Sequence, residues 1–563
     1  MFKFFKALKK AHKRIAFKVD KRPSLALKLT SLFAFIFAAQ PLFAQSASSS
    51  NMMMYGLVAI GVILVLGVIM QVGDNLVQIE AHTHNAQLTG NRIMPKLSGI
   101  MQRKLPKHLR DKDVHVFKRG FNILLEGEAS GPVTDAKHVT RYALQPPNWR
   151  GIAPIPKMHV AVGDNVLAGQ PLFYNKPNPE IEFVAPVSGE VIEINRGAKR
   201  AITEVVILAD KEVQYTEFNA PNLEDATRED LVDFLLKSGA WSLLRQRPYD
   251  VLPAKDAVPA NIFISTFDSA PLAPDLNLVI EGREQDFQKG LDVLGALTEG
   301  KVHIGLDGRD NKMPASGFAD AEGVEKHWFR GPHPCGNVGV QIHHVAPITA
   351  TKAVWVMGVQ DVMTLGGLFL RGKYDASRVV AITGDPVENN VYLKTFAGAN
   401  IGELLEGNTV QTNSRLINGD VLSGQAGSAK GYLNMFDDQL TVVEEGNYFE
   451  IFGWMVPQKA RPSMSKTFWN FLMPKRKYLA DTNTHGEKRA FVMTGEYERV
   501  LPMDIFPQHL FKAILTDDFE RMEGLGIYEL SEEDVALCEF GCTSKMPLQE
   551  ILRDGLDLMR EQG

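Results

Sequence analysis

Two apolar stretches near the start restrict the fold of this 563-residue chain more than any other feature. Residues 29–44 and residues 55–72 contain no charged side chain. The second stretch reaches the length of about 18 residues that a helix needs to cross a hydrocarbon layer of about 30 Å. The first follows a basic leader and ends in small residues around Ala44, as a signal peptide does. The sequence therefore predicts one or two membrane spans, although a buried core helix is an alternative for 55–72.

The positive charges around these stretches predict how the chain is oriented. Lysine and arginine are abundant before residue 29 and after residue 73, whereas the linker 45–54 contains neither. Short segments rich in lysine and arginine stay on the cytoplasmic side of a membrane. We therefore expect everything beyond residue 73 to face the cytoplasm, whether or not the chain is cleaved near Ala44.

The part of the chain that follows is acidic and poor in cysteine. Beyond residue 120 it has 42 basic and 61 acidic residues and no basic stripe with interleaved aromatic side chains, which argues against nucleic acid as a partner. The three cysteines, Cys335, Cys538 and Cys542, are too few for a tetrathiolate zinc site or an iron–sulfur cluster. The histidines between 303 and 344 also lack a metal-binding spacing such as HExxH. We expect no metal site.

Short β-rich runs separated by glycine turns occupy residues 151–208. Residues 160–173 and residues 184–194 each read as a strand, a turn and a second strand. The two phrases resemble the halves of a barrel-sandwich hybrid, the fold of biotinyl and lipoyl domains. Lys176 lies near the expected hairpin tip, but it sits beside proline rather than the methionine or small residues expected next to a modified lysine. We therefore predict a structural barrel rather than a lipoylated or biotinylated carrier.

From residue 223 the apolar pattern alternates between amphipathic helices and short buried strands. This order predicts βαβ units, and hence a parallel sheet with right-handed crossovers. The glycine-rich turns after residue 383 resemble a compact β-grasp module, and Ser531 can cap a helix that starts with three acidic residues. The predicted helices cover 228–237 and 286–297, and the predicted strands cover 260–265, 301–306, 353–357 and 378–383.

These patterns predict an α/β multidomain chain made of five units. The first, 1–113, holds the basic leader, the transmembrane segments and a linker. It is followed by a barrel-sandwich hybrid domain (114–222), a Rossmann-like α/β domain (223–377), a β-grasp domain of the soluble-ligand-binding type (378–440), and a β return with a C-terminal helical region (441–563).

A set of phrases in fixed order gives the chain a family resemblance. Ile194–Arg200 reads INRGAKR, and Gly331–His344 reads GPHPCGNVGVQIHH. They are followed by ITGDPVENNVYL at Ile382–Leu393 and RLINGDVLSG at Arg415–Gly424. Together these phrases resemble the NqrA-type subunit of the Na+-translocating NADH:quinone oxidoreductases (the Nqr complex), and the resemblance extends over residues 114–563. The two apolar stretches depart from the usual pattern of that family, in which this subunit is peripheral.

The resemblance also implies which cofactors the chain lacks. The family is similar to the C-type subunit of the Rnf electron-transport complex and to the flavin-bearing subunit of respiratory NADH dehydrogenase. Those relatives place FMN and NADH phosphates over a glycine-rich loop. The corresponding residues 238–249 have one glycine and bulky side chains such as Trp241 and Arg245, and the relatives' acidic loop corresponds to 268–271, without its second carboxylate. No GxGxxG or P-loop motif is present, so we expect no tightly bound cofactor in this subunit.

The phrase GPHPCGNVGV is the most unusual local sequence and supplies the first candidate site. Its prolines and glycines specify a rigid loop whose backbone can approach a ligand closely. His333 can donate a hydrogen bond or a proton to a quinone carbonyl, since an imidazole titrates near neutral pH. Nearby aromatic residues can supply the flat apolar surface that ligand sites offer. The predicted quinone-binding residues are Trp328, Phe329, Gly331, His333, Pro334 and Gly336.

Two alternatives to this site stay open at this point. The loop can equally be a tight turn between domains, with its aromatic neighbours in the core. The β-grasp loop 385–390 is a second candidate, through Asp385, Glu388 and Asn389. No nucleophile–base pair stands out, so we predict no catalytic residue.

The resemblance implies a subunit of a Na+-pumping complex that transfers electrons from NADH to quinone. This subunit is expected to contribute quinone interaction and docking to the other subunits, especially the membrane-embedded quinone and flavin subunit. The expected location is the bacterial inner membrane, with the main domain on the cytoplasmic side. The alternatives are a membrane-tethered NADH–FMN oxidoreductase subunit of the Rnf type and a purely structural assembly subunit.

Overall fold

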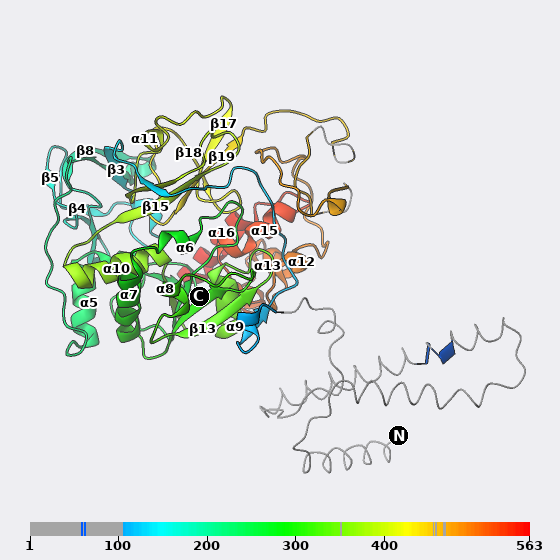
Figure 1. Cartoon of the computed structure of the whole chain (residues 1–563), viewed down its shortest axis with the longest axis horizontal. Coiled ribbons are helices and arrows are strands. Elements are labelled where there is room, and N and C mark those ends of the chain that lie inside the picture. The colour runs from blue at the N-terminus through cyan, green and yellow to red at the C-terminus, as the bar shows by residue number, and fades with distance from the viewer. Residues whose placement is uncertain are drawn as a thin grey trace, which may run out of the picture. The chain divides into compact units, whose positions relative to one another are not determined.

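The computed structural model describes residues 105–349, 352–453, 455, 459–464 and 469–562, together with Val58, Ala59, Gly61 and Val62. The chain divides into two units, 1–104 and 105–563, and the second holds nearly all described residues (Figure 1). The two predicted membrane spans, 29–44 and 55–72, lie outside the described residues except for those four. Within the described part, no helix combines the length and the apolar character needed to cross a bilayer.

Two small antiparallel sheets form the barrel that precedes the α/β domain. Their inward side chains share a core, in which the rings of Phe173 and Phe183 stack with centroids 4.8 Å apart. Lys176 is exposed in the turn between two strands, near the predicted hairpin tip. One sheet consists of β3 (Arg141–Leu144), β9 (Ile202–Ala209), β8 (Gly189–Arg196) and β5 (Asn165–Val166), and the other of β4 (Lys157–Met158), β6 (Pro171–Asn175) and β7 (Asn178–Val184).

A six-stranded sheet forms the centre of the α/β domain, in the order β1-β13-β12-β11-β14-β10. Its neighbouring strands are parallel except for β10, which runs antiparallel at one edge. This is the parallel sheet that the alternation of helices and strands predicts. The strands are β1 (Val114–Val116), β10 (Arg245–Arg247), β11 (Ile262–Ser265), β12 (Val302–Asp307), β13 (Glu325–Arg330) and β14 (Val354–Val356).

Successive side chains of these strands face opposite layers of helices. Ile262 and Ile264 of β11 join the core that includes side chains of α7 and α10. Phe263, which lies between them, joins the core of α9 and the C-terminal helices. The helices of the first layer are α5 (Arg228–Lys237), α7 (Glu284–Leu297) and α10 (Val359–Arg371), with the short helices α6 (Leu276–Val279) and α8 (Ser316–Ala319) nearby.

Helices from the C-terminal region cover the second face of the sheet together with α9 (Val338–Val345). Their core joins Phe263 and Val356 of the sheet to Leu510 and Phe511. Ser531 starts α15 with a capping box, as its place before three acidic residues predicts. These helices are α12 (Tyr497–Val500), α13 (Pro507–Ile514), α14 (Phe519–Gly524), α15 (Glu532–Gly541) and α16 (Leu548–Gln562).

The predicted helices of the α/β domain agree closely with the structure. The helix predicted over 228–237 is α5, and a capping box between Thr227 and Asp230 closes its first turn. The helix predicted over 286–297 is α7, which begins slightly earlier, at Glu284. Both helices can be predicted from the sequence because their apolar side chains recur at the helical period.

A second six-stranded sheet follows, in the order β18-β17-β19-β15-β16-β2. The strand predicted over 378–383 is β15 (Ser377–Thr383) at its centre. The sheet extends past residue 440, because β19 (Gln439–Glu444) lies between β15 and β17. Its other elements are β2 (Val133–Asp135), β16 (Tyr392–Phe396), β17 (Ser414–Asn418), β18 (Gln425–Gly427) and the short helix α11 (Ile401–Leu404).

The segment before the barrel takes part in both large sheets. β1 pairs with β13 in the α/β sheet, and β2 pairs with β16 in the second sheet. The sequence-based division assigns residues from 114 onward to the barrel unit. The alternation in Val114–Phe117 identifies a strand, but a local pattern carries no information about which distant strand it joins.

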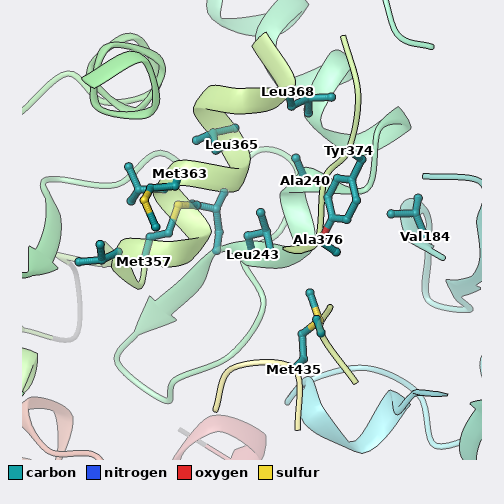
Figure 2. Close-up of a cluster of buried hydrophobic side chains, with 14 of the residues drawn as sticks. Val184, Ala240, Leu243, Met357, Met363, Leu365, Leu368, Tyr374, Ala376 and Met435 are labelled. Atoms are coloured by element: carbon teal, nitrogen blue, oxygen red, sulfur yellow. The ribbon is translucent and has the colours of Figure 1, made fainter. Parts of the chain in front are cut away.

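The barrel, the α/β domain and the second sheet share one buried core. Figure 2 shows Val184 of the barrel, Tyr374 and Met435 around Ala240. Gly239 permits this approach, since its φ is +75° and a Cβ there would lie 2.6 Å from the Val184 side chain. The glycine at the start of the bulky segment therefore serves the packing of two domains.

Candidate functional site

The loop 331–337 connects β13 to α9 and packs against the loop that follows β11. The backbone N–H of His333 donates to Asn122 Oδ1 at 2.8 Å, and His333 Nδ1 lies 3.0 Å from Ser269 Oγ. The Gly336 N–H also donates to Ser269 Oγ, at 2.9 Å. A Cβ on Gly336 would lie 2.6 Å from the backbone N of Ser269, so glycine is required for this contact. The loop is thus fixed against residues 268–271.

Trp328 and Phe329 lie in the buried core. Both belong to β13 and are buried. The Trp328 ring lies 5.6 Å from the His108 ring, and Phe329 stacks on His115 with centroids 5.0 Å apart. Protein side chains cover both rings, and their contact with a quinone stays a prediction.

His333 lines a small cavity of about 260 Å³ between the loop 331–337 and α15, named here the His333 cavity. Its Nε2 is buried and has no hydrogen-bond partner in the described part of the chain. Burial lowers the pKa of His333 to about 4, so the imidazole is neutral at physiological pH. Three carboxylates share the wall of this cavity, those of Asp268, Asp420 and Glu533.

These carboxylates give the His333 cavity a negative electrostatic character. The pKa of Asp268 is raised to about 6, first by loss of solvation and then by the neighbouring Asp420 carboxylate. Glu533 is paired with Arg247, whose Nη2 lies 2.7 Å from Glu533 Oε1. Glu533 is balanced by Arg247, but Asp268 and Asp420 still make the cavity less favourable for an anion.

The second predicted loop lies apart from both cavities described here. Asp385, Glu388 and Asn389 are exposed and line neither of them. The Asn389 N–H donates to Asn408 Oδ1 at 3.0 Å, and Asn408 Nδ2 donates to Asn389 O at 2.7 Å. The Glu388 N–H donates to Thr409 O at 3.0 Å. These bonds fix the backbone of the loop and leave its side chains facing solvent.

A larger pocket, of about 740 Å³ including the solvent at its open mouth, lies where the three domains meet and is named here the junction cavity. Its walls come from Trp149 and the preceding η3 (Pro146–Asn148), from residues 244–252 around β10, and from residues 434–437 before β19. Gln425 of β18 completes the wall. The sequence shows no motif for the cavity, because it forms only when four distant segments meet. The sequence singles out Arg245 only as one of the bulky side chains of the segment 238–249.

Arg245 presents its guanidinium group to the junction cavity. Its Cζ lies 5.2 Å from the centre of the Phe436 ring, which is a cation–π contact. Its Nε is buried without a hydrogen-bond partner, and no ion pair of Arg245 is found among the described residues. Arg150 on the same wall is instead paired with Asp250 at 2.7 Å and with Glu532 at 2.6 Å. Arg245 therefore donates no side-chain hydrogen bond to the described residues, although the neighbouring Asp250 carboxylate partly balances its charge.

The facing wall combines aromatic surface with a carboxyl group of raised pKa. The rings of Trp149 and Phe436 meet edge to face with centroids 6.1 Å apart. Burial raises the pKa of Asp437 to about 6, although Asn434 Nδ2 donates to Asp437 Oδ2 at 2.8 Å. A carboxyl group with such a pKa can hold or release a proton near neutral pH. The cavity thus offers aromatic surface, a cationic donor and a titratable acid.

The segment 238–249 is filled by its own side chains and their neighbours. Trp241 is fully buried, and its Nε1–H donates to Pro253 O at 2.9 Å. The Trp241 ring meets the Trp355 ring edge to face, with centroids 5.2 Å apart. A phosphate cradle requires free backbone N–H groups beside small residues, and here bulky rings occupy that space.

Within the described ranges, no group of three or more His, Cys, Asp or Glu side chains is arranged to hold a metal ion. Cys335, Cys538 and Cys542 are free and buried. Tyr497 Oη lies 2.8 Å from Cys542 Sγ, inside the core of the C-terminal helices. The cysteines of this region therefore contribute to packing.

Comparison with known proteins identifies three domain families along the chain. The NqrA N-terminal barrel-sandwich hybrid domain matches residues 115–210, and the NqrA second alpha/beta domain matches residues 226–374. The NQRA C-terminal domain matches residues 379–428. The predicted barrel and α/β domain are thereby confirmed.

Whole proteins match over the same region. The NqrA-type subunit of the Na(+)-translocating NADH-quinone reductase of Vibrio campbellii is 38% identical over 449 residues, covering 79% of this chain and 99% of the relative. Its counterpart in Neisseria meningitidis is 37% identical with the same coverage. Among solved structures, an NAD+-reducing NiFe-hydrogenase chain aligns with a TM-score of 0.32 and 12% identity over 62% of this chain and 72% of that chain, too distant to bear on function. By these matches, the chain belongs to the family of NqrA-type subunits of the Na+-translocating NADH-quinone reductases.

Proposed function

We propose that this chain works as the NqrA-type component of a complex that passes electrons from NADH to quinone and translocates Na+. The observation that carries this proposal is the continuous alignment with the relative from Vibrio campbellii, which spans 99% of that protein. Within the complex the chain contributes quinone interaction and docking to the membrane-embedded partner subunits. The complex resides in the bacterial inner membrane, and the lysines and arginines around the apolar stretches favour a cytoplasmic position for the main domain.

We place the quinone head group in the junction cavity. A quinone ring is planar and largely apolar and carries two carbonyl oxygens, so it needs aromatic walls and one or two hydrogen-bond donors. The half-buried Phe436 offers ring surface, with the buried Trp149 behind it, and Arg245 offers N–H groups that make no hydrogen bond to the described residues. The guanidinium is also a fixed positive charge, which stabilises the negative charge that a quinone gains on reduction.

Charge and size favour the junction cavity over the predicted site at His333. Counting the solvent at their mouths, the His333 cavity holds about 260 Å³ and the junction cavity about 740 Å³. Three carboxylates line the His333 cavity, whereas in the junction cavity Asp250 and Asp437 are balanced by Arg150 and Arg245. The carboxylates of the His333 cavity would repel the anion of a reduced quinone. His333 Nε2 still has no partner among the described residues, so quinone binding by the loop 331–336, and by Asp385, Glu388 and Asn389, stays a prediction.

We propose further that this subunit binds no flavin or nucleotide tightly. The buried rings around Trp241 and the domain contact of Gly239 leave the segment 238–249 without a phosphate cradle, which supports the proposal. A purified chain with flavin absorbance, or with tight NADH binding, would instead favour the oxidoreductase of the Rnf type. A purely structural assembly subunit would show no effect of quinone at all.

Replacement of Arg245 tests the quinone assignment. In the assembled complex, Arg245→Ala is expected to raise the quinone KM by about tenfold to a hundredfold, because a charge-assisted hydrogen bond contributes about 1.5–3 kcal/mol. The KM for NADH is expected to stay unchanged. Arg245→Lys keeps the charge but loses the planar pair of donors. Its quinone KM is therefore expected to lie between that of the natural chain and that of Arg245→Ala.

Arg521→Ala is the matched control for this experiment, since Arg521 is 76% exposed on α14. It is expected to leave both KM values unchanged, and melting temperatures show whether each variant is folded. An unchanged quinone KM in a folded Arg245→Ala complex would remove the quinone from the junction cavity while leaving membership of the complex intact.

A further inference from the structure

A segment after the second sheet carries an unusual number of exposed apolar side chains. Phe449 is 99% exposed and Ile451 84%, and four further residues are each at least half exposed. Figure 1 shows this segment as orange loops at the margin of the described chain. The exposed apolar residues are Phe449, Ile451, Phe452, Met455, Leu472 and Met473, which together with Lys475, Arg476 and Lys477 are named here the apolar arm.

One ion pair within this segment is buried. Glu450 lies between two exposed apolar residues, yet its side chain is 5% exposed and is paired with Arg461, which is 13% exposed. Arg461 Nη2 also donates to Gly453 O at 2.6 Å, and Asn470 Nδ2 donates to Arg461 O at 2.7 Å. A loop that faces water normally shows the opposite distribution, with charges outside and bulky apolar groups covered. The buried ion pair thus holds the apolar side chains outward.

Three consecutive basic residues adjoin these apolar side chains. Lys475, Arg476 and Lys477 are exposed. Lys477 Nζ lies 3.1 Å from the exposed Glu128 carboxylate, an ion pair that solvent weakens, and Arg476 lies over the Tyr478 ring at 5.6 Å. Bulky apolar groups beside clustered lysine and arginine match the interface of an anionic bilayer. There the apolar groups enter the headgroup region and the basic groups pair with lipid phosphates.

We propose that the apolar arm binds the surface of an anionic lipid bilayer. The charge of the remaining chain supports this choice of partner, because beyond residue 120 it has 42 basic against 61 acidic residues. An anionic surface repels an acidic body, so a local basic cluster determines which face approaches it. The inference goes beyond the proposed function, since neither quinone nor NADH enters it.

A site-specific fluorescent label tests the proposal in the full chain. Cys335, Cys538 and Cys542 are buried, so a thiol-reactive, environment-sensitive dye reacts with an introduced, exposed cysteine. Ile451→Cys places the dye on the apolar arm, and Val162→Cys, at a barrel residue that is 60% exposed, is the matched control. Each labelled chain is reconstituted with vesicles of phosphatidylcholine, alone or mixed with phosphatidylglycerol.

The dye at residue 451 is expected to shift to shorter wavelength and to be quenched by spin-labelled lipid when phosphatidylglycerol is present. The dye at residue 162 is expected to stay in water, and any effect of residues 1–104 is common to both chains. The triple variant Lys475→Glu, Arg476→Glu, Lys477→Glu is expected to abolish the quenching, because each basic residue contributes roughly fivefold to binding at an anionic surface. The matched charge control reverses exposed residues of the barrel, Lys176, Lys199 and Arg200, and is expected to keep the quenching.

Three results would overturn the proposal. They are a dye at residue 451 that stays in water with both lipid mixtures, equal quenching in both mixtures, and quenching that requires the other subunits of the complex. The last result would assign the apolar arm to a protein interface. Since the assay contains no quinone or NADH, its failure leaves the proposed function untouched.

Discussion

Two arginines of β10 illustrate how partners decide the role of a charged side chain. Arg247 is buried, with Nη1 3.1 Å from Asp534 Oδ2 and Nη2 2.7 Å from Glu533 Oε1. Arg245 faces the junction cavity and, among the described residues, has no ion pair within 4 Å, although the Asp250 carboxylate on the same wall is close enough for its pKa to be lowered by Arg245. A paired arginine holds structure together, whereas an unpaired one at a cavity wall is available to a ligand.

Removal of the Arg247 side chain tests the structural half of this contrast. Arg247→Met is expected to lower the free energy of unfolding by about 3–5 kcal/mol, because the buried Asp534 carboxylate loses its counter-ion. Denaturation in urea measures this change. The control is Lys255→Met, which breaks an exposed 2.7 Å pair with Asp233 and is expected to have no measurable effect. Equal stabilities of the two variants would contradict a structural role for Arg247.

At the residue scale, the sequence shows which side chains could bind a ligand more readily than it shows where they lie in the fold. His333 lines a cavity, whereas the side chains of Trp328 and Phe329 are buried in the core. Phe436 and Asp437 carry no recognisable signal, although they complete the junction cavity with Trp149. Their place in the cavity wall depends on contacts between segments hundreds of residues apart, which no local pattern encodes.

The contact between α7 and α10 depends on small residues at the helix interface. A Cβ on Gly290 would lie 2.2 Å from Val362 O, and one on Gly366 would lie 1.8 Å from Asp286 O. Arg371 adds two hydrogen bonds to the Asp286 carboxylate, at 2.6 and 2.9 Å. Glycine is unfavourable within a helix, so its presence here reflects the close approach of two backbones.

Alanine substitutions in α7 separate these two effects of glycine. Gly290→Ala is expected to lower the free energy of unfolding by about 1–3 kcal/mol, because the new methyl group overpacks the interface. Gly295→Ala, in the same helix with no atom within 4 Å of the added Cβ, is expected to raise it by about 0.5–1 kcal/mol. Thermal unfolding of both variants checks this, and a stabilised Gly290→Ala chain would contradict the close contact.

A buried histidine, His303, beside the half-buried His327 on the neighbouring strand is expected to make the α/β sheet sensitive to acid. His303 Nδ1 of β12 lies 3.0 Å from His327 Nε2 of β13. Burial, and then the neighbouring His327, lowers the pKa of His303 to about 4. The unfolded chain therefore takes up a proton near pH 6.5, well before the folded chain does. The contribution of neutral His303 to the free energy of unfolding is therefore complete above pH 6.5, and it is lost as the pH falls toward 4.

The pH dependence of unfolding tests this linkage. Between pH 6.5 and pH 4, His303 is expected to remove about 3 kcal/mol of stability. His303→Gln cannot titrate, so its unfolding free energy is expected to fall less over this range than that of the natural chain. His138→Gln, at an exposed position, is the control and should reproduce the natural slope. Identical slopes for all three chains would exclude His303 as a source of acid sensitivity.

At the scale of elements, periodicity and caps predict α5, α7 and α15 well. The sheets that β1 and β2 join are not predictable in this way, since an edge strand is completed by residues far along the chain. The apolar arm has no regular period either. Its significance appears only when the structure shows which of its side chains are covered.

At the scale of the whole molecule, three domains meet around one buried core, and the junction cavity lies at their edge. The family match spans all three, from residue 115 to residue 428. The cavity is lined by residues of all three domains, so quinone binding there would depend on how the domains pack against one another. This arrangement makes the location of the quinone the central claim about the chain.

Photo-crosslinking with an azido-quinone in the assembled complex tests that claim most directly. Mass spectrometry of the labelled peptides is expected to find the label within residues 147–150, 244–252 or 434–437, which line the junction cavity. Excess unlabelled quinone should prevent the labelling, and Arg245→Ala should strongly reduce it. Label confined to the loop 331–336, or to a partner protein of the complex, would contradict the assignment.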